Sequence, residues 1–334
     1  MASMSTDPSL PAPPGVEYCY RHPAEQTGVH CTRCGKPICP ACMIEAPVGY
    51  QCPDCVAEAR REFSRGPGRR IAVANAKAVS ATNVLLAMIG AVFVVEIVIG
   101  GPNALLLGPS SRQLYDMGGA AAFFAQVQPV FRFLPGIATG QYWRLVTSMF
   151  LHVGLIHIAF NAYALYLFGT VIENELGRLR LLLIYFATGI FAGAASYAFG
   201  TPGVVGAGAS GAIFGLFGAF FAYNFRRRRS ALAAARLRQM IQLIVLNAIL
   251  ALSLHFIDWR AHLGGLVAGV AAGYVAEGWG NLSKRRVILV VGFSAILLAA
   301  AGLVVWRTDQ LSHDPVIGPY LAGASAQAGS GAAR

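Results

Sequence analysis

The sequence has little charge. Only 12% of its 334 residues are Asp, Glu, Lys or Arg, about half the roughly 25% of a typical soluble domain, and 56% are hydrophobic. This composition predicts a membrane protein. The net charge of +11 does not indicate nucleic-acid binding, because the basic residues stand in short runs at the ends of apolar segments, where Lys and Arg fix membrane topology.

Cysteine is absent after Cys55, and all seven cysteines lie within the first 55 residues. The first 78 residues also lack an apolar run that could form the core of a signal peptide, so we do not expect export of the N-terminus through a cleaved signal. Paired cysteines in a segment that is not exported indicate metal binding rather than disulfides.

The cysteine segment predicts two zinc sites. Its pairs are Cys19 with His22, Cys31 with Cys34, Cys39 with Cys42, and Cys52 with Cys55. Eight ligands make two tetrahedral sites, and thiolate-rich sets select zinc. Alternating pairs favour a cross-brace, with the first and third pairs on one ion and the second and fourth on the other; sequential pairing stays open. The segment resembles B-box-type zinc fingers, with approximate spacing.

A segment this short has too little core to fold alone, so we expect the two zinc ions to be structural and to supply folding energy. His30 is a possible substitute ligand. We expect the module to have a regulatory role or to bind a cytoplasmic protein partner.

Seven apolar segments near the roughly 20 residues of a spanning helix predict an all-α polytopic membrane protein. They lie at about 81–100, 147–170, 179–199, 208–225, 239–256, 261–277 and 286–306. The connection 101–146 is too apolar for an ordinary loop and is expected at the membrane interface. With a cytoplasmic N-terminus only six of the 26 Lys and Arg fall outside, so we predict an external C-terminus.

Two glycine-flanked polar residues begin separate apolar segments. Ser210 stands in Gly208-Ala-Ser-Gly and His262 in Ala-His-Leu-Gly-Gly, and the topology places both near the outer face. His262 shares a helical stripe with Gly265, Gly269 and Gly273, which allows close approach of helices in lipid. Close approach brings a hydroxyl within reach of an imidazole, as an activated nucleophile requires. The alternative is that these glycines serve only the ordinary packing of helices through small residues, and that the serine and histidine are incidental.

His157 and Asn161, four residues apart, face the same way in the second apolar segment. Two donors at the depth of the serine suit an oxyanion site completed by the Ser210 backbone N–H, unless they are only interhelical hydrogen bonds. His152 lies about 140° from His157 around a helix, so we expect a structural or interfacial role for it.

These elements together resemble the rhomboid family of intramembrane serine proteases, of bacterial type. The ordered set is Trp143-Arg144, His157-x-x-x-Asn161, ENELGRLR from Glu173 to Arg180, Gly208-Ala-Ser-Gly, and Ala261-His-Leu-Gly-Gly. The resemblance covers about residues 80–280. It implies a six-helix bundle, here with a seventh helix, in which Ser210 is the nucleophile, His262 its base, and His157 and Asn161 oxyanion donors.

The resemblance further implies that Trp143 and Arg144 stabilise the external loop, and that catalysis needs no cofactor. Gly208, Gly211 and Phe214 are expected to surround the catalytic pair; many bacterial members have tyrosine where this chain has Phe214. The family uses a dyad, so Asp258 as a third member and His255 as a rival base are lesser alternatives.

The expected activity is endopeptidase cleavage of transmembrane protein substrates near the outer face of the plasma (inner) membrane. The main alternative is a catalytically silent rhomboid-like adaptor that binds transmembrane client proteins. A channel or transporter is disfavoured, because the chain has no paired inverted repeat and no acidic residue deep in the spans beyond Glu96.

The predicted organisation has six parts. They are a disordered leader at 1–16, the zinc module at 17–56, a basic linker at 57–80, the protease core at 81–280, the seventh helix at 281–306 and a disordered external tail at 307–334.

Overall fold

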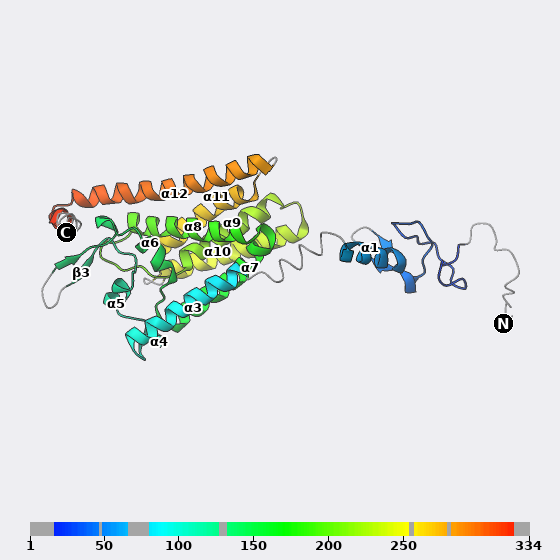
Figure 1. The fold of residues 1–334 in the computed structure, drawn as a ribbon, viewed down its shortest axis with the longest axis horizontal. Coiled ribbons are helices and arrows are strands. Elements are labelled where there is room, and N and C mark those ends of the chain that lie inside the picture. The colour runs from blue at the N-terminus through cyan, green and yellow to red at the C-terminus, as the bar shows by residue number, and fades with distance from the viewer. Residues whose placement is uncertain are drawn as a thin grey trace. The chain divides into compact units, whose positions relative to one another are not determined.

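The computed structural model describes residues 17–46, 49–65, 80–126, 132–253, 257–278 and 282–323. The chain forms two compact units, Met1–Val79 and Ser80–Arg334 (Figure 1). The predicted leader, most of the predicted linker, the end of the tail and the candidate base His255 lie outside the described residues.

The first unit is built around cysteine. It contains the 3-10 turn η1 (Pro40–Cys42), a hairpin of β1 (Ile44–Glu45) and β2 (Tyr50–Gln51), and helix α1 (Pro53–Arg65). Its core consists of Ile38 and six buried cysteines, with Tyr20 and Met43 packed against them. So small an apolar core agrees with the expectation that bound metal supplies folding energy.

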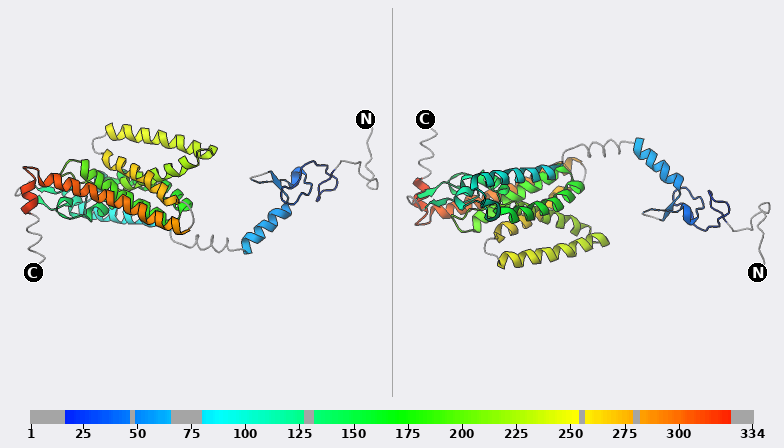
Figure 2. Two further views of the ribbon diagram at one scale, coloured as in Figure 1. Left: turned by 90° about the horizontal axis from the view of Figure 1, so that it is seen from above. Right: turned by 90° about the horizontal axis from the view of Figure 1, so that it is seen from below.

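Seven long helices dominate the described residues of the second unit, and each overlaps one of the predicted apolar segments. They are α3 (Ala81–Gly100), α7 (Gly154–Leu176), α8 (Arg178–Phe199), α9 (Ser210–Arg226), α10 (Ala231–Ser253), α11 (Trp259–Glu277) and α12 (Leu282–Ser312). Helices α8, α9 and α11 pack tightly together at the centre, and α12 packs against α8 and α11. Helix α10 lies at the edge of the bundle, apart from α12 (Figure 2).

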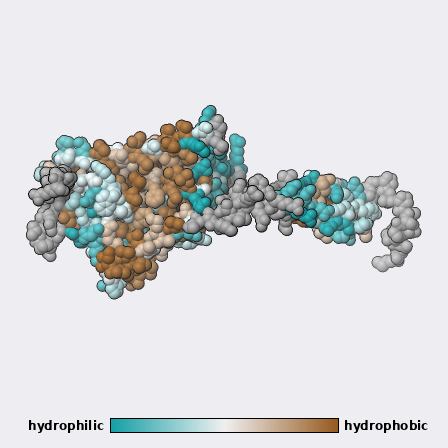
Figure 3. Space-filling view, viewed as in Figure 1, coloured by the Kyte–Doolittle hydropathy of each residue, from teal (hydrophilic) through white to brown (hydrophobic). Residues whose placement is uncertain are grey.

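Four of the described helices, namely α3, α7, α8 and α12, are long and apolar enough to cross a membrane. Hydrophobic residues cover the middle of the face of the helical unit drawn in Figure 3, with hydrophilic residues toward its ends. Helix α9 has only 17 residues. The protein is therefore a multi-pass membrane protein, and the prediction of seven spans remains a prediction.

The second apolar segment differs from expectation at its start. Residues 147–153 form the end of α6 (Arg144–Thr147), the turn η3 (Ser148–Phe150) and an irregular stretch, and α7 begins only at Gly154. Gly154 has φ +82°, a conformation that side chains other than glycine rarely adopt. This left-handed residue separates the two helical pieces and places His152 outside α7.

The connection 101–146 is folded in the parts that the structure describes, 101–126 and 132–146. It holds α4 (Ala104–Leu107), α5 (Ser111–Asp116), the hairpin of β3 (Phe124–Gln126) and β4 (Arg132–Leu134), and η2 (Ile137–Thr139). The predicted disordered tail also differs from expectation at its start, because α12 continues to Ser312 and both Leu311 and Leu321 are buried in a cluster with Ile137. Apolar burial against this connection orders these residues.

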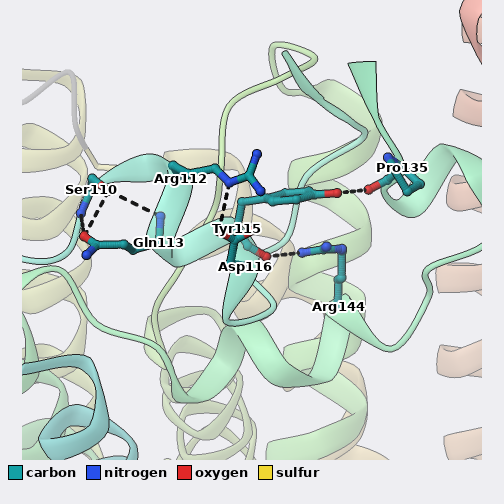
Figure 4. Close-up of polar contacts among 7 residues, drawn as sticks. All are labelled: Ser110, Arg112, Gln113, Tyr115, Asp116, Pro135 and Arg144. Carbon is teal, nitrogen blue, oxygen red and sulfur yellow. Dashed lines mark hydrogen bonds and ion pairs between the residues drawn. The ribbon is translucent and has the colours of Figure 1, made fainter. Parts of the chain in front are cut away.

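Arg144 holds the connection together (Figure 4). Its side chain is 4% exposed and donates to the carbonyls of Tyr115 at 2.7 Å and Gly119 at 3.0 Å, and to Gln141 Oε1. The guanidinium also lies 4.1 Å from the Tyr115 ring centroid. Burial lowers the pKa of Arg144, but these partners compensate the buried charge. The expected structural role of Arg144 agrees with this geometry.

We expect Arg144→Ala to destabilise the helical unit by about 2–3 kcal/mol, because it leaves buried carbonyl groups without a donor. Thermal unfolding in detergent measures the change. Arg112→Ala is the matched control: its ion pair with Asp116 is exposed, and such pairs contribute about 0–1 kcal/mol. Equal unfolding temperatures for the two variants would contradict this role.

Candidate active site

Ser210 and His262 lie together. Ser210 is the first residue of α9 and His262 the fourth of α11, and His262 Nε2 lies 2.9 Å from Ser210 Oγ. The nitrogen that faces the hydroxyl must be the acceptor if Ser210 is to donate its proton, which leaves the ring proton on Nδ1. This is the hydrogen bond that an activated serine requires.

An aromatic ring orients the histidine. The ring of Phe214, one turn after Ser210 on α9, stacks on His262 with centroids 4.3 Å apart and an interplanar angle of 17°. Stacking restrains rotation of the imidazole without a hydrogen bond. A phenol at this position is therefore not needed to hold the ring.

His157 lies next to Gly208, two residues before the serine. The backbone N–H of Val153 donates to His157 Nδ1 at 3.1 Å, so the ring proton belongs on Nε2. Nε2 faces Gly208: a Cβ built at Gly208 would lie 3.1 Å from His157 Nε2 and 3.7 Å from Ser210 Oγ. A glycine at position 208 thus leaves open the space between the histidine and the serine.

Asn161 supplies a second donor on the same helix. Its side chain is 5% exposed, and among the described residues Nδ2 has no hydrogen-bond partner. An unpaired buried amide is costly unless a ligand or transition state uses it. With His157 Nε2 and the Ser210 N–H, which as the first of a helix has no acceptor within α9, the arrangement suits a developing oxyanion.

Asp258 is engaged elsewhere. Its carboxylate caps α11 by accepting from the N–H groups of Arg260 and Ala261, and it accepts from Ser196 Oγ of α8. The hydrogen bonds of this carboxylate therefore fix the first turn of α11 rather than the His262 ring. The sequence did not single out Ser196, since no local spacing links it to residue 258.

The cysteine unit brings its eight predicted ligands into two groups. One is Cys19, His22, Cys39 and Cys42; the other is Cys31, Cys34, Cys52 and Cys55. Within each, the ligand atoms lie within 4.8 Å of one another, and His22 Nδ1 is 3.2 Å from Cys39 Sγ and 3.4 Å from Cys42 Sγ. Tetrahedral zinc with bonds of 2.0–2.3 Å gives edges of roughly 3.5–3.8 Å, so both sets fit such an ion.

The grouping is the cross-braced one. His30 belongs to neither group and instead pairs with Glu17. Burial raises the pKa of the Cys19 and Cys31 thiols, but backbone N–H donors outweigh it and bring each pKa to about 6. Burial and neighbouring thiols raise the pKa of Cys42 to about 11. The three crowded thiols of one group and the four of the other cannot all ionise easily without a cation, and a bound divalent metal relieves this repulsion.

The helical unit is similar in sequence to known proteins. Residues 139–279 match the family model described as Rhomboid domain. The chain is 36% identical over 180 residues to Rhomboid protease GluP of Bacillus subtilis (strain 168), covering 53% of this chain and 34% of GluP. It is 34% identical over 218 residues to RHOMBOID-like protein 6, mitochondrial, of Arabidopsis thaliana, covering 60% of this chain and 66% of that protein. These matches support assignment of the chain to the rhomboid family.

A third relative bears on activity. The chain is 30% identical over 165 residues to Inactive RHOMBOID-like protein 8 of Arabidopsis thaliana, covering 49% of this chain and 43% of that protein. The chain spans about a third of GluP and no more than 66% of either Arabidopsis protein. The relatives come from a bacterium and a plant, so they leave the bacterial assignment a prediction.

Phe214→Ala should slow labelling of Ser210 by a fluorophosphonate about two- to tenfold, because an aromatic stack contributes roughly 0.5–1.5 kcal/mol to the ring orientation. Phe214→Tyr keeps the stack and should label like wild type. Phe217→Ala is the matched control, since Phe217 contacts Phe214 but has no ring contact with His262 among the described residues. An unchanged rate in Phe214→Ala would contradict the orienting role.

Elemental analysis of the purified chain should give about two zinc ions per molecule, one for each group of four ligands. Cys52→Ser should lower the ratio to about one, because three ligands hold zinc less tightly. His30→Ala should keep both ions, because His30 belongs to neither group. Two tightly held ions in Cys52→Ser would contradict the assignment.

Proposed function

We propose that the chain is an intramembrane serine endopeptidase that cleaves transmembrane segments of membrane proteins near the outer face of the membrane. The hydrogen bond of 2.9 Å between His262 Nε2 and Ser210 Oγ carries the proposal. Two side-chain donors, the half-buried His157 and the buried Asn161, lie on the neighbouring helix α7. Polar groups at membrane depth are expensive and default to a functional role.

In the first half-reaction Ser210 Oγ attacks the scissile carbonyl carbon while His262 Nε2 takes the hydroxyl proton. The carbonyl oxygen becomes an oxyanion that accepts hydrogen bonds from the Ser210 N–H, His157 Nε2 and Asn161 Nδ2. His262 then gives its proton to the leaving amine, the C–N bond breaks, and an acyl ester remains on Ser210.

In the second half-reaction water attacks the ester. His262 takes a proton from the water, a second tetrahedral oxyanion forms in the same donor set, and its collapse returns the proton to Ser210 Oγ and releases the acid product. Only protein groups and water take part in these steps. Because water is a reactant, the site must open toward an aqueous side of the membrane.

The substrate helix must unwind before it is cut, because the carbonyls of a spanning helix are already hydrogen-bonded. We propose that it approaches laterally past α10, which packs against α9 and α11 at the edge of the bundle. The distribution of Lys and Arg supports a cytoplasmic N-terminus, an external C-terminus and a plasma (inner) membrane location.

We propose two structural zinc ions in the first unit, each held by one of the two four-ligand groups. The ions would fix the fold of the unit. Both ligand sets are complete, so they favour a structural rather than a catalytic role, and a cytoplasmic protein partner is the expected use of the unit.

A rhomboid-like adaptor that binds transmembrane clients without cleaving them is the second candidate, because one relative is named inactive. The hydrogen bond between His262 and Ser210, together with the donors His157 and Asn161 on α7, favours the enzyme.

Fluorophosphonate labelling of the protein in detergent distinguishes the two. Wild type should be labelled, and Ser210→Ala and His262→Ala should each lose labelling by at least about 1000-fold, because nucleophile and base act as one unit. His313→Ala, an exposed histidine on the tail, is the control and should label like wild type. Labelling that survives in Ser210→Ala would refute the assignment of the nucleophile.

Cleavage itself is tested in cell membranes that express wild type or Ser210→Ala. Mass spectrometry of new protein termini should find ends within or next to transmembrane segments that appear only with wild type. Identical termini in both samples, with a labelled wild type, would favour the adaptor.

A further inference from the structure

Glu96 is a buried acidic residue that the proposed chemistry does not use. It lies in the last turn of α3, where it continues the buried stripe formed by Leu85, Ile89 and Phe93, and its side chain is 0% exposed. An ionisable group buried in an apolar helix is expensive, and a leucine would fill such a position at lower cost. The position of Glu96 therefore calls for a function.

The carboxyl group meets the turn that precedes α7. Glu96 Oε1 accepts from the backbone N–H of His152 at 2.7 Å, a contact between residues 56 positions apart. The His152 side chain is also 0% exposed, and its Nδ1 lies 3.2 Å from the carbonyl oxygen of Phe150. The turn 150–153 is thus tied to α3 by one side chain.

The same turn sets the orientation of His157. The next backbone N–H along the chain, that of Val153, donates to His157 Nδ1 at 3.1 Å, and the His152 and His157 rings lie 5.2 Å apart. This bond leaves the proton on Nε2, the ring nitrogen that lies next to Gly208. If the turn shifts, the donor to Nδ1 shifts with it, and the ring can adopt the wrong tautomer.

We propose that Glu96 is a positioning residue for the oxyanion site: it fixes the turn at His152, whose neighbour Val153 orients the donor His157. This inference rests on the proposed function. The competing hypothesis is that Glu96 only links α3 to the turn before α7 and has no effect on His157. The experiments below distinguish these two hypotheses. The residue works through one hydrogen-bond acceptor, so an uncharged acceptor of the same shape should replace it.

The first measurement is the rate at which a fluorophosphonate labels Ser210 in folded protein. Glu96→Leu should slow labelling about tenfold or more, since small misplacements of a reacting group are costly. Glu96→Gln keeps an oxygen acceptor for the His152 N–H and should restore most of the rate. Ile89→Ala is the matched control on α3: it removes buried contacts about two turns before Glu96 and leaves the Glu96 hydrogen bond in place, so the rate per folded molecule should stay near that of wild type.

A double-mutant cycle shows whether Glu96 acts through His157. His157→Ala alone should slow labelling about 100-fold, as for loss of one oxyanion donor. In that background Glu96→Leu should change the rate by less than about twofold, because the effect has already been lost. If the two substitutions slow labelling independently, so that their rate factors multiply in the double variant, the proposal is overturned and a purely structural role of Glu96 is favoured.

Nitrogen NMR of protein labelled in histidine reads the ring without any activity. Wild type and Glu96→Gln should show His157 protonated on Nε2, and Glu96→Leu should show a changed tautomer or a mixture; His157→Asn identifies the signal. An unchanged His157 signal in Glu96→Leu would overturn the proposal even if Ser210 is never labelled. Absence of labelling in wild type would count against the proposed function alone.

Discussion

The close contact between α9 and α11 is the constraint on which the site depends. A Cβ at Gly265 or Gly269 would overlap the backbone carbonyls of Gly211 and Gly215, and one at Gly273 would lie 2.7 Å from the Ala219 oxygen. Helices in lipid gain no hydrophobic driving force from each other, so packing at this distance requires small residues. Only such backbone contact lets a short serine side chain reach the imidazole of the facing helix.

The other groups of the site are placed by bonds between distant segments. Asp258 joins the start of α11 to Ser196 of α8, which sets the turn that carries His262. On the opposite side, Glu96 of α3 holds the turn before α7, which carries His157. Both histidines are thus carried by segments that a carboxylate fixes, and among the described residues neither carboxylate hydrogen-bonds to the histidine ring.

Much of this arrangement can be predicted from the sequence. The spacing of His262, Gly265, Gly269 and Gly273 defines a close-packing stripe, and the regular pairs of cysteines define two ligand sets. The bond between Glu96 and His152 could not be predicted, because no local pattern connects residues 56 positions apart. Hydropathy alone also predicts that the second helix begins at 147, because Leu151 and Val153 are as apolar as the residues of α7, which begins at Gly154.

The central claim is that Ser210, His262, His157 and Asn161 form one catalytic unit. An experimental structure of the protein with a phosphonate bound covalently to Ser210 tests it most directly, because the phosphoryl oxygen occupies the place of the oxyanion. The account predicts this oxygen within hydrogen-bond distance, about 2.7–3.1 Å, of the Ser210 N–H nitrogen, His157 Nε2 and Asn161 Nδ2. A phosphoryl oxygen turned away from both α7 side chains would contradict it.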